Sequence, residues 1–139
     1  MTLPRIDHIG IIVADLDAAI ARFSALLGIA SERRELPEVG LRIAEFHTEN
    51  LGIELIAYEG SASFARRVMG SESGINHMTL SVDSIEAALE RLGAAGFRAQ
   101  PAFPRRGAHG TIAFLERDPV TGLLFELCAS DGHEGKEQS

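Results

Sequence analysis

Two stretches of the chain repeat one pattern: residues 6–23 read IDHIGIIVADLDAAIARF and residues 75–92 read INHMTLSVDSIEAALERL. Each begins with Ile, a polar residue and His, continues into an apolar run typical of a strand, and passes an Asp into an amphipathic stretch with helical periodicity. Aligning His8 with His77 sets an offset of 77 − 8 = 69 residues. This spacing is too long for a solenoid repeat and indicates a duplicated supersecondary unit.

The alternation of side chains along each strand separates the histidine from the apolar residues. In the first copy Ile9, Ile11 and Val13 share one face, and His8 and Gly10 share the other. The second copy follows the same rule, with its apolar residues opposite the face of the second histidine: Met78, Leu80 and Val82 against His77, Thr79 and Ser81. The apolar faces are therefore expected to pack under the helices.

The helices and the remaining strands follow the same order in both copies. The first helix is expected to begin after Asp15 as N-cap and to end at Gly28. The second is expected to begin at Asp83, with Glu86 completing a capping box. Three shorter strands are expected after each helix: roughly 30–35, 41–48 and 52–58, then 97–101, 111–117 and 122–129. Each half reads βαβββ, which predicts an α+β fold.

The domain organisation follows from this duplication, because 139 residues suit one compact domain. The stretch between the copies is rich in Gly and Ser and holds a short predicted helix near 64–69. The sequence predicts a single domain with these parts: module one over 5–59, a linker over 60–74, module two over 75–130 and a polar tail over 131–139.

The composition excludes several functional classes. With 45% hydrophobic and 24% charged residues the chain can bury a core. A formal charge of −7 and a pI near 5.2 disfavour binding to nucleic acid or to an anionic membrane. No apolar stretch is long enough to span a bilayer, and the first ten residues do not resemble a signal peptide. Cys128 is the only cysteine, so we expect a reducing compartment and a cytoplasmic protein.

Two glutamates repeat as well. Glu54 in GIELIA and Glu126 in LFELCA each lie among aliphatic residues in the last predicted strand of a module. A buried carboxylate needs a partner, a proton or a metal. Taken singly, a strand Glu usually faces solvent and a lone His is usually structural. The matched pairs instead favour convergence of two imidazoles and two carboxylates on one divalent ion, a donor set that suits Co, Mn, Ni, Zn or Fe.

The chain resembles the vicinal oxygen chelate superfamily, which includes glyoxalases, bleomycin-resistance proteins and dioxygenases, from about Ile6 to Ala129. The resemblance implies two βαβββ modules that form a half-open β-barrel cup around a divalent metal. It places the family's metal ligands on the four residues of the repeated pattern: His8, Glu54, His77 and Glu126.

Within the superfamily the chain is most similar to the methylmalonyl-CoA epimerases, in the stretches IDHIGIIVADLDAA, GLRIAEFHTENLGIELI and GAHGTIAFLERDPVTGLLFEL. This similarity implies a metal-dependent epimerase of methylmalonyl-CoA or a similar 2-substituted acyl-CoA. The reaction would abstract the α-proton and pass through a metal-stabilised enolate. Glu126 is the best-placed candidate for one catalytic role, since it is also an implied ligand. The candidates for the other role are Glu45, Glu54 and a metal-bound water.

The chain departs from the epimerase pattern in two places. Residues 116–118 read Glu-Arg-Asp where such epimerases commonly carry His-Pro-Lys. Ile43 stands where some members place a second catalytic carboxylate, and Glu45 lies two residues on, hence on the same face of the strand. Glu45 is therefore the residue that would replace it.

An acyl-CoA substrate carries phosphates, which an acidic protein must bind with local positive charge. The candidate substrate-binding residues are two arginine pairs and a histidine in a glycine-flanked loop: Arg66, Arg67, Arg105, Arg106 and His109. The arginines fit a solvated surface equally well, and the histidine also fits a turn-capping role.

Two other functions fit the same fold: a glyoxalase I-type lactoylglutathione lyase and a non-catalytic protein that binds a small molecule such as an antibiotic. An extradiol dioxygenase usually needs tyrosine and further histidine acid–base groups, and Tyr58 is the sole tyrosine. Exposed edge strands and the habits of the family favour a homodimer.

Overall fold

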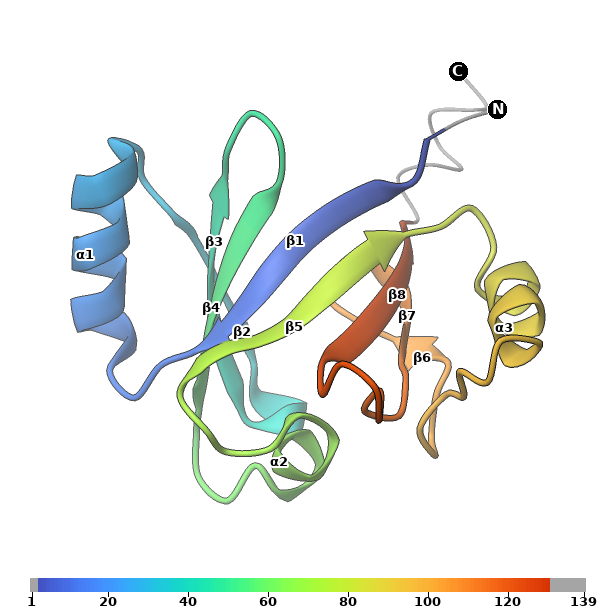
Figure 1. The fold of residues 1–139 in the computed structure, drawn as a ribbon. Coiled ribbons are helices and arrows are strands. Elements are labelled where there is room, and N and C mark those ends of the chain that lie inside the picture. The colour runs from blue at the N-terminus through green and yellow to red at the C-terminus, as the bar shows by residue number, and fades with distance from the viewer. Residues whose placement is uncertain (1–2, 131–139) are drawn as a thin grey trace. The chain divides into compact units, whose positions relative to one another are not determined.

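The structure, a computed structural model, describes residues 3–130, so the predicted tail over 131–139 lies outside it. The first module runs through these elements: β1 (Arg5–Ile12), α1 (Leu16–Leu27), β2 (Glu32–Leu36), the 3-10 turn η1 (Pro37–Val39), β3 (Leu41–His47) and β4 (Gly52–Tyr58) (Figure 1). The linker holds the helix α2 (Ser63–Met69). The second module then repeats the order of the first: β5 (Gly74–Ser81), α3 (Ile85–Gly93), β6 (Arg105–Arg106), β7 (Gly110–Phe114) and β8 (Leu124–Ser130). The predicted α+β class and the βαβββ modules are confirmed.

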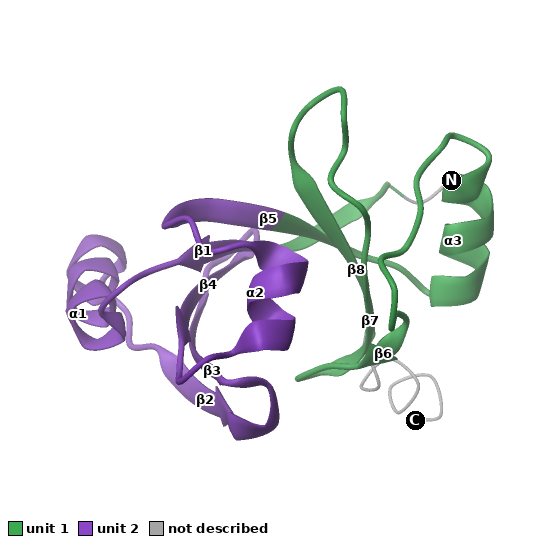
Figure 2. Ribbon diagram, turned by 90° about the horizontal axis from the view of Figure 1, so that it is seen from below, with its two compact units in different colours: residues 1–7, 78–139 green, residues 8–77 purple. Residues whose placement is uncertain are grey.

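The chain divides into two compact units (Figure 2). Unit 2 consists of residues 8–77, and unit 1 takes the described residues of 1–7 and 78–139. The boundaries cut β1 immediately before His8 and β5 immediately after His77. Both histidines of the repeated pattern therefore belong to unit 2.

The strands of unit 2 lie in the order β2-β3-β4-β1, with β1 parallel to β4 and the other pairs antiparallel. One face packs against α1 around five buried residues: Leu16, Ala44, Phe46, Leu55 and Ala57. Phe46 and Leu55 are fully buried, which contributes about 1.5–3 kcal/mol for each side chain. The opposite face of the sheet therefore carries the alternate residues, among them His8, Glu45 and Glu54.

The ends of α1 follow the predicted capping. The Asp15 carboxylate accepts a hydrogen bond from the Ala18 amide at 3.0 Å. Gly28 adopts a left-handed conformation with φ of 73° and donates its N–H to the Ser24 carbonyl. These two contacts fix where the helix begins and ends.

In unit 1 the strand order is β5-β8-β7-β6, and α3 packs on a separate core: Ile85, Ala88, Ala113, Leu115 and Leu127. The predicted cap of α3 is wrong by one residue, because the Ser84 hydroxyl, and not Asp83, accepts from the Ala87 amide at 3.1 Å. The Val82 amide donates to the Cys128 carbonyl at 2.8 Å, so the extended chain continues one residue beyond the end of β5.

The strand predicted over 97–101 is also wrong. The segment makes only a single antiparallel bridge, between Ala99 and Leu115, and the edge strand of this module is Arg105–Arg106. Pro101 ends the pairing because it has no N–H to donate to a ladder. The other two strands of the module form close to the predicted ranges, over 110–114 and 124–130.

Within residues 3–130, none of the helices has the length and apolar character needed to cross a membrane.

Candidate metal centre

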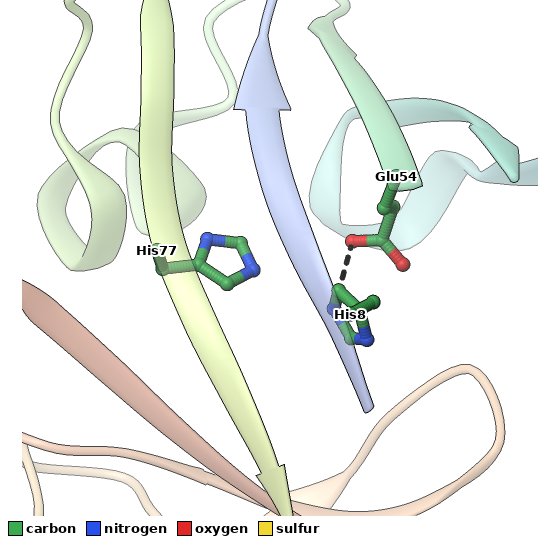
Figure 3. A group of neighbouring side chains, drawn as sticks. All are labelled: His8, Glu54 and His77. Atoms are coloured by element: carbon green, nitrogen blue, oxygen red, sulfur yellow. Dashed lines mark ion pairs between the residues drawn. The ribbon is translucent and has the colours of Figure 1, made fainter. Parts of the chain in front are cut away.

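The first predicted pair of ligands lies on adjacent strands of unit 2. His8 is on β1 and Glu54 is on β4, and the parallel register sets them diagonally, with His8 beside Gly52 and Gly10 beside Glu54. The Nε2 atom of His8 is 3.6 Å from Oε1 of Glu54, and both side chains are largely buried at 16% and 14% exposed (Figure 3). The carboxylate and the imidazole therefore face each other on one side of the sheet.

The third predicted ligand, His77, is on β5 and is 3% exposed. Its ring centroid lies 5.7 Å from that of His8, with the two rings nearly perpendicular. Burial, with the charge of His8 as a smaller cause, lowers the pKa of His77 from 6.5 to about 3. The imidazole is therefore neutral at physiological pH, which is the form that binds a metal ion.

Gly10 makes room for the ring of His77. A β-carbon on Gly10 would lie 2.2 Å from Cε1 and 2.4 Å from Nε2 of His77. The ring thus occupies the space above β1 that a side chain would fill, and it reaches toward the strand position paired with Glu54. The sequence pattern places Gly10 on the histidine face but does not assign it a function. A glycine inside a strand often marks a point where another group lies close to the backbone, and this signal could have indicated Gly10.

The three side chains fit one divalent ion. A ligand atom from each of His8, Glu54 and His77 lies within 4.8 Å of those of the other two. Nitrogen and oxygen ligands sit about 2.0–2.2 Å from such an ion, so two of them on one ion are roughly 3–4 Å apart. The spacing of the three ligand atoms is therefore within about 1 Å of what a shared ion requires.

The fourth predicted ligand, Glu126, is on β8 in unit 1. It is 6% exposed, and the Thr79 hydroxyl donates a hydrogen bond to its Oε1 at 2.6 Å. Thr79 is itself fully buried on β5, two residues after His77 and hence on the same face of that strand. Coordination by Glu126 stays a prediction.

Glu45, the second catalytic candidate, is on β3 directly opposite Glu54 in the antiparallel register. Opposed residues of such a pair point to the same face, so the two carboxylates are neighbours. Glu45 is 6% exposed, and Nη2 of Arg34 is 3.7 Å from its Oε1. The positive charge of Arg34 offsets the repulsion between the Glu45 and Glu54 carboxylates. The position of Arg34 beside Glu45 depends on how the strands pair and could not be recognised from the sequence pattern alone.

A second group of possible ligands lies at the edge of the same sheet: Glu32, Glu45 and His47. Nε2 of His47 is 3.4 Å from Oε1 of Glu32, and both of these side chains are more than 60% exposed. Because Arg34 already contributes a positive charge beside Glu45, this edge is less suited to a dication than the group around His77.

The candidate substrate-binding arginines of the linker lie on α2. The Arg66 guanidinium stacks 4.4 Å above the Tyr58 ring and donates to the Ser61 carbonyl at 2.8 Å. Arg67 is exposed and lies 5.5 Å above the Phe64 ring. Arg66 therefore has a structural function that its sequence position did not indicate.

The remaining candidates lie in unit 1. Arg105 and Arg106 form β6, where they pair with Ile112 and Thr111 of β7, and both are exposed. His109 is exposed in the loop that joins these strands. Substrate binding by these three residues stays a prediction.

Comparisons with known proteins agree with this geometry. A model of the Glyoxalase/Bleomycin resistance protein/Dioxygenase superfamily matches residues 7–114. The ethylmalonyl-CoA/methylmalonyl-CoA epimerase of Cereibacter sphaeroides is 34% identical over 128 residues, which cover 88% of this chain and 96% of the relative. The crystal structure of methylmalonyl-CoA epimerase from Mycobacterium tuberculosis has a TM-score of 0.76 and 27% identity, covering 95% of this chain and 91% of that one. A methylmalonyl-CoA epimerase in complex with methylmalonyl-CoA and NH4+ has a TM-score of 0.75 and 28% identity, covering 94% and 96%.

These similarities extend over nearly the whole chain, so they concern the complete fold and both modules. They confirm the resemblance that the sequence motifs indicate, and with it an enzyme of the epimerase type. The chain belongs to the Glyoxalase/Bleomycin resistance protein/Dioxygenase superfamily.

Proposed function

We propose that the protein is a metal-dependent epimerase of methylmalonyl-CoA or a similar 2-substituted acyl-CoA. The observation that carries the proposal is the group formed by His8, Glu54 and His77, whose ligand atoms lie within 4.8 Å of one another. The similarity to a solved epimerase in complex with methylmalonyl-CoA supports the substrate class.

The reaction inverts the carbon between a thioester and a carboxylate. The bond from this carbon to hydrogen breaks, its electron pair moves into an enolate, and a proton returns to the opposite face of the same carbon. A divalent ion bound by the three residues would supply Lewis-acid polarisation of the substrate oxygens. Imidazole and carboxylate ligands suit Co, Mn, Ni, Zn or Fe, and we propose one of these ions as the cofactor.

Two carboxylates are proposed to move the proton. The Thr79 hydroxyl donates a hydrogen bond to Oε1 of Glu126, which orients this carboxylate for coordination or proton transfer. Glu45 lies opposite Glu54 with Arg34 at 3.7 Å, which stabilises a buried carboxylate at that place. Ile43, which is buried opposite Ile56, cannot take part in acid–base chemistry, so Glu45 takes the second catalytic role in this proposal.

The coenzyme A phosphates need cationic partners. Arg67, Arg105, Arg106 and His109 are exposed, and we assign them to this interaction. Arg66 can contribute only if its guanidinium keeps donors in addition to the one bonded to the Ser61 carbonyl, which its five N–H groups allow. The proposed assembly is a homodimer, which sedimentation analysis of the purified protein would test.

The test follows the α-proton of methylmalonyl-CoA by NMR in D₂O, with metal-loaded and EDTA-treated protein. We expect the signal to wash out only with the loaded protein, and His77→Asn to abolish the exchange. His47→Asn serves as the matched control, because His47 is exposed at the sheet edge and lies outside the proposed ligand group.

A parallel assay measures lactoylglutathione formation from methylglyoxal and glutathione. Formation of this product without α-proton exchange would replace the proposal with a glyoxalase I-type lyase. Activity in neither assay would contradict catalysis on both substrates and leave small-molecule binding as the function.

A further inference from the structure

Asn76 connects the end of the linker helix to the imidazole of His77. Its Oδ1 is 2.9 Å from Nδ1 of His77, and its Nδ2 donates to the Met69 carbonyl at 2.8 Å. Met69 is the last residue of α2, and Asn76 immediately precedes His77 in β5. The side-chain amide therefore bridges two segments of unit 2.

These two contacts determine which ring nitrogen carries the proton. The Met69 carbonyl only accepts hydrogen bonds, so the NH₂ group of Asn76 must face it. The amide oxygen then faces His77, and because this oxygen also only accepts, Nδ1 must be the protonated nitrogen. A neutral imidazole carries one N–H, so Nε2 keeps a lone pair.

The opposite amide orientation is disfavoured. It would set two oxygen atoms 2.8 Å apart, at Met69 and Asn76, with no proton between them. His77 is 3% exposed, and a second proton on its ring would place a positive charge in this buried position.

The edge of the His77 ring that carries both nitrogens lies over the glycine of β1, with Cε1 as the nearest atom, 2.2 Å from the place of a β-carbon. Nε2 is 2.4 Å from the place of a β-carbon on Gly10, and Nδ1 is 2.7 Å from it. Gly10 is paired with Glu54, and the ring of His8 is the neighbouring imidazole. Because Nδ1 is engaged by Asn76, Nε2 is the nitrogen of His77 that can act as a ligand atom beside His8 and Glu54.

We propose that Asn76 is a positioning residue that sets the tautomer of His77 and holds its ring over Gly10, so that Nε2 can bind a divalent ion. This inference rests on the metal site of the proposed function. It assigns Asn76 a role through His77 and not by contact with the ion or the substrate.

The other copy of the repeat shows that the amide is specific to this strand. The position equivalent to Asn76 is Asp7, because 76 − 69 = 7. An ionised aspartate has no hydrogen to donate to a carbonyl, so it cannot make the bridge that Asn76 makes to Met69. Only the second copy can therefore tie its histidine to the preceding helix in this way.

The test begins with metal-free, ¹⁵N-labelled protein and long-range ¹H–¹⁵N correlation of the histidine rings. We expect His77 to show a protonated Nδ1 in the wild-type protein and a mixture of tautomers in Asn76→Leu. Asn76→Asp keeps an acceptor at Nδ1 and is expected to retain the wild-type tautomer. Asn50→Leu is the matched control, because Asn50 is exposed in the loop between β3 and β4, where it accepts from the Thr48 hydroxyl.

The second readout is Zn²⁺ affinity by competition with a chelator. We expect Asn76→Leu to weaken binding by about 10–100-fold, as loss of an outer-shell partner of a metal-bound histidine typically does. Asn50→Leu is expected to bind close to the wild type. Asn76→Asp keeps the acceptor for Nδ1 but loses the bond to the Met69 carbonyl, so we expect its affinity to lie between those of the wild type and Asn76→Leu. Circular dichroism of each variant establishes that it is folded.

The proposal is overturned if wild-type His77 carries its proton on Nε2, or if folded Asn76→Leu keeps both the tautomer and the Zn²⁺ affinity of the wild type. If Asn76→Leu does not fold, Asn76→Asp decides, and a proton on Nε2 in that variant would overturn the inference. If the wild-type protein binds Zn²⁺ nowhere near His77 while the tautomer behaves as expected, the proposed function fails and the positioning by Asn76 stands.

Discussion

A β-carbon on Gly10 and the ring of His77 would occupy the same place, since the nearest ring atom is only 2.2 Å from that carbon. Two residues that are 77 − 10 = 67 positions apart in sequence are thereby packed against each other. Because Gly10 has no side chain, the imidazole of His77 can extend over β1 toward Glu54.

We expect Gly10→Ala to displace the ring and to weaken Zn²⁺ binding strongly. Overpacking of this kind typically costs about 1–3 kcal/mol in the free energy of unfolding. Chelator competition and urea denaturation measure the two effects. Gly93→Ala is the control, because a β-carbon there meets nothing within 4 Å. Unchanged affinity in Gly10→Ala would contradict the role of His77 as a ligand.

The stability of the metal-free protein is expected to fall as the pH decreases from 6.5 toward about 3. His77 has a lowered pKa in the folded state, so only the unfolded chain takes up a proton on this imidazole in that range. The contribution is fully present above pH 6.5 and is lost as the pH approaches about 3. Urea denaturation in EDTA should show a shallower pH dependence for His77→Asn than for the wild type, and equal slopes would contradict the prediction.

Thr79→Val is expected to destabilise the protein by about 1–3 kcal/mol, because the buried Glu126 carboxylate loses a donor. It should also slow α-proton exchange, since Glu126 would no longer be held in one orientation. Thr79→Ser keeps the hydroxyl and should recover most of both properties. The comparison is made by denaturation and by the D₂O assay, and equal behaviour of the two variants would show that the hydroxyl has no such function.

Arg34→Gln is expected to lower both stability and α-proton exchange, because it removes the positive charge 3.7 Å from the buried Glu45 carboxylate. Arg33→Gln is the matched control from the neighbouring position. Arg33 pairs with Asp17 at 2.7 Å on the exposed side, where such a pair contributes about 0–1 kcal/mol. Exchange rates that fall equally in the two variants would remove Glu45 from the proposed mechanism.

Much of the fold follows from local patterns in the sequence. The alternation around His8 and the periodicity that begins at Asp15 determine a strand and a helix without reference to the rest of the chain. The second strand of the second module could not be located in this way. The residues over 97–101 have strand-like character, but Pro101 limits the pairing to one bridge and the chain pairs again only at Arg105.

The residues of the candidate site that occur in both halves of the chain could be predicted from the sequence. The duplication indicates His8 and His77, and the repeated strand ends indicate Glu54 and Glu126. The supporting residues occur only once in the chain and depend on contacts between strands. Arg34 needs the β2–β3 register, and Asn76 needs the approach of the α2 end to β5, neither of which leaves a periodic signal.

The carbonyl of Met69, the last residue of α2, and that of Gly70, which follows the helix, both accept hydrogen bonds from side chains of the sheet. Met69 accepts from Asn76 on β5, and Gly70 accepts from the Tyr58 hydroxyl on β4. A helix C-terminus would ordinarily turn these groups to water. Here the segment joining the two modules is anchored to the strands that present His77 and Glu54, so unwinding of its last turn would release the imidazole. The packing of the linker helix and the position of the His77 imidazole are thus coupled through one side-chain amide, that of Asn76.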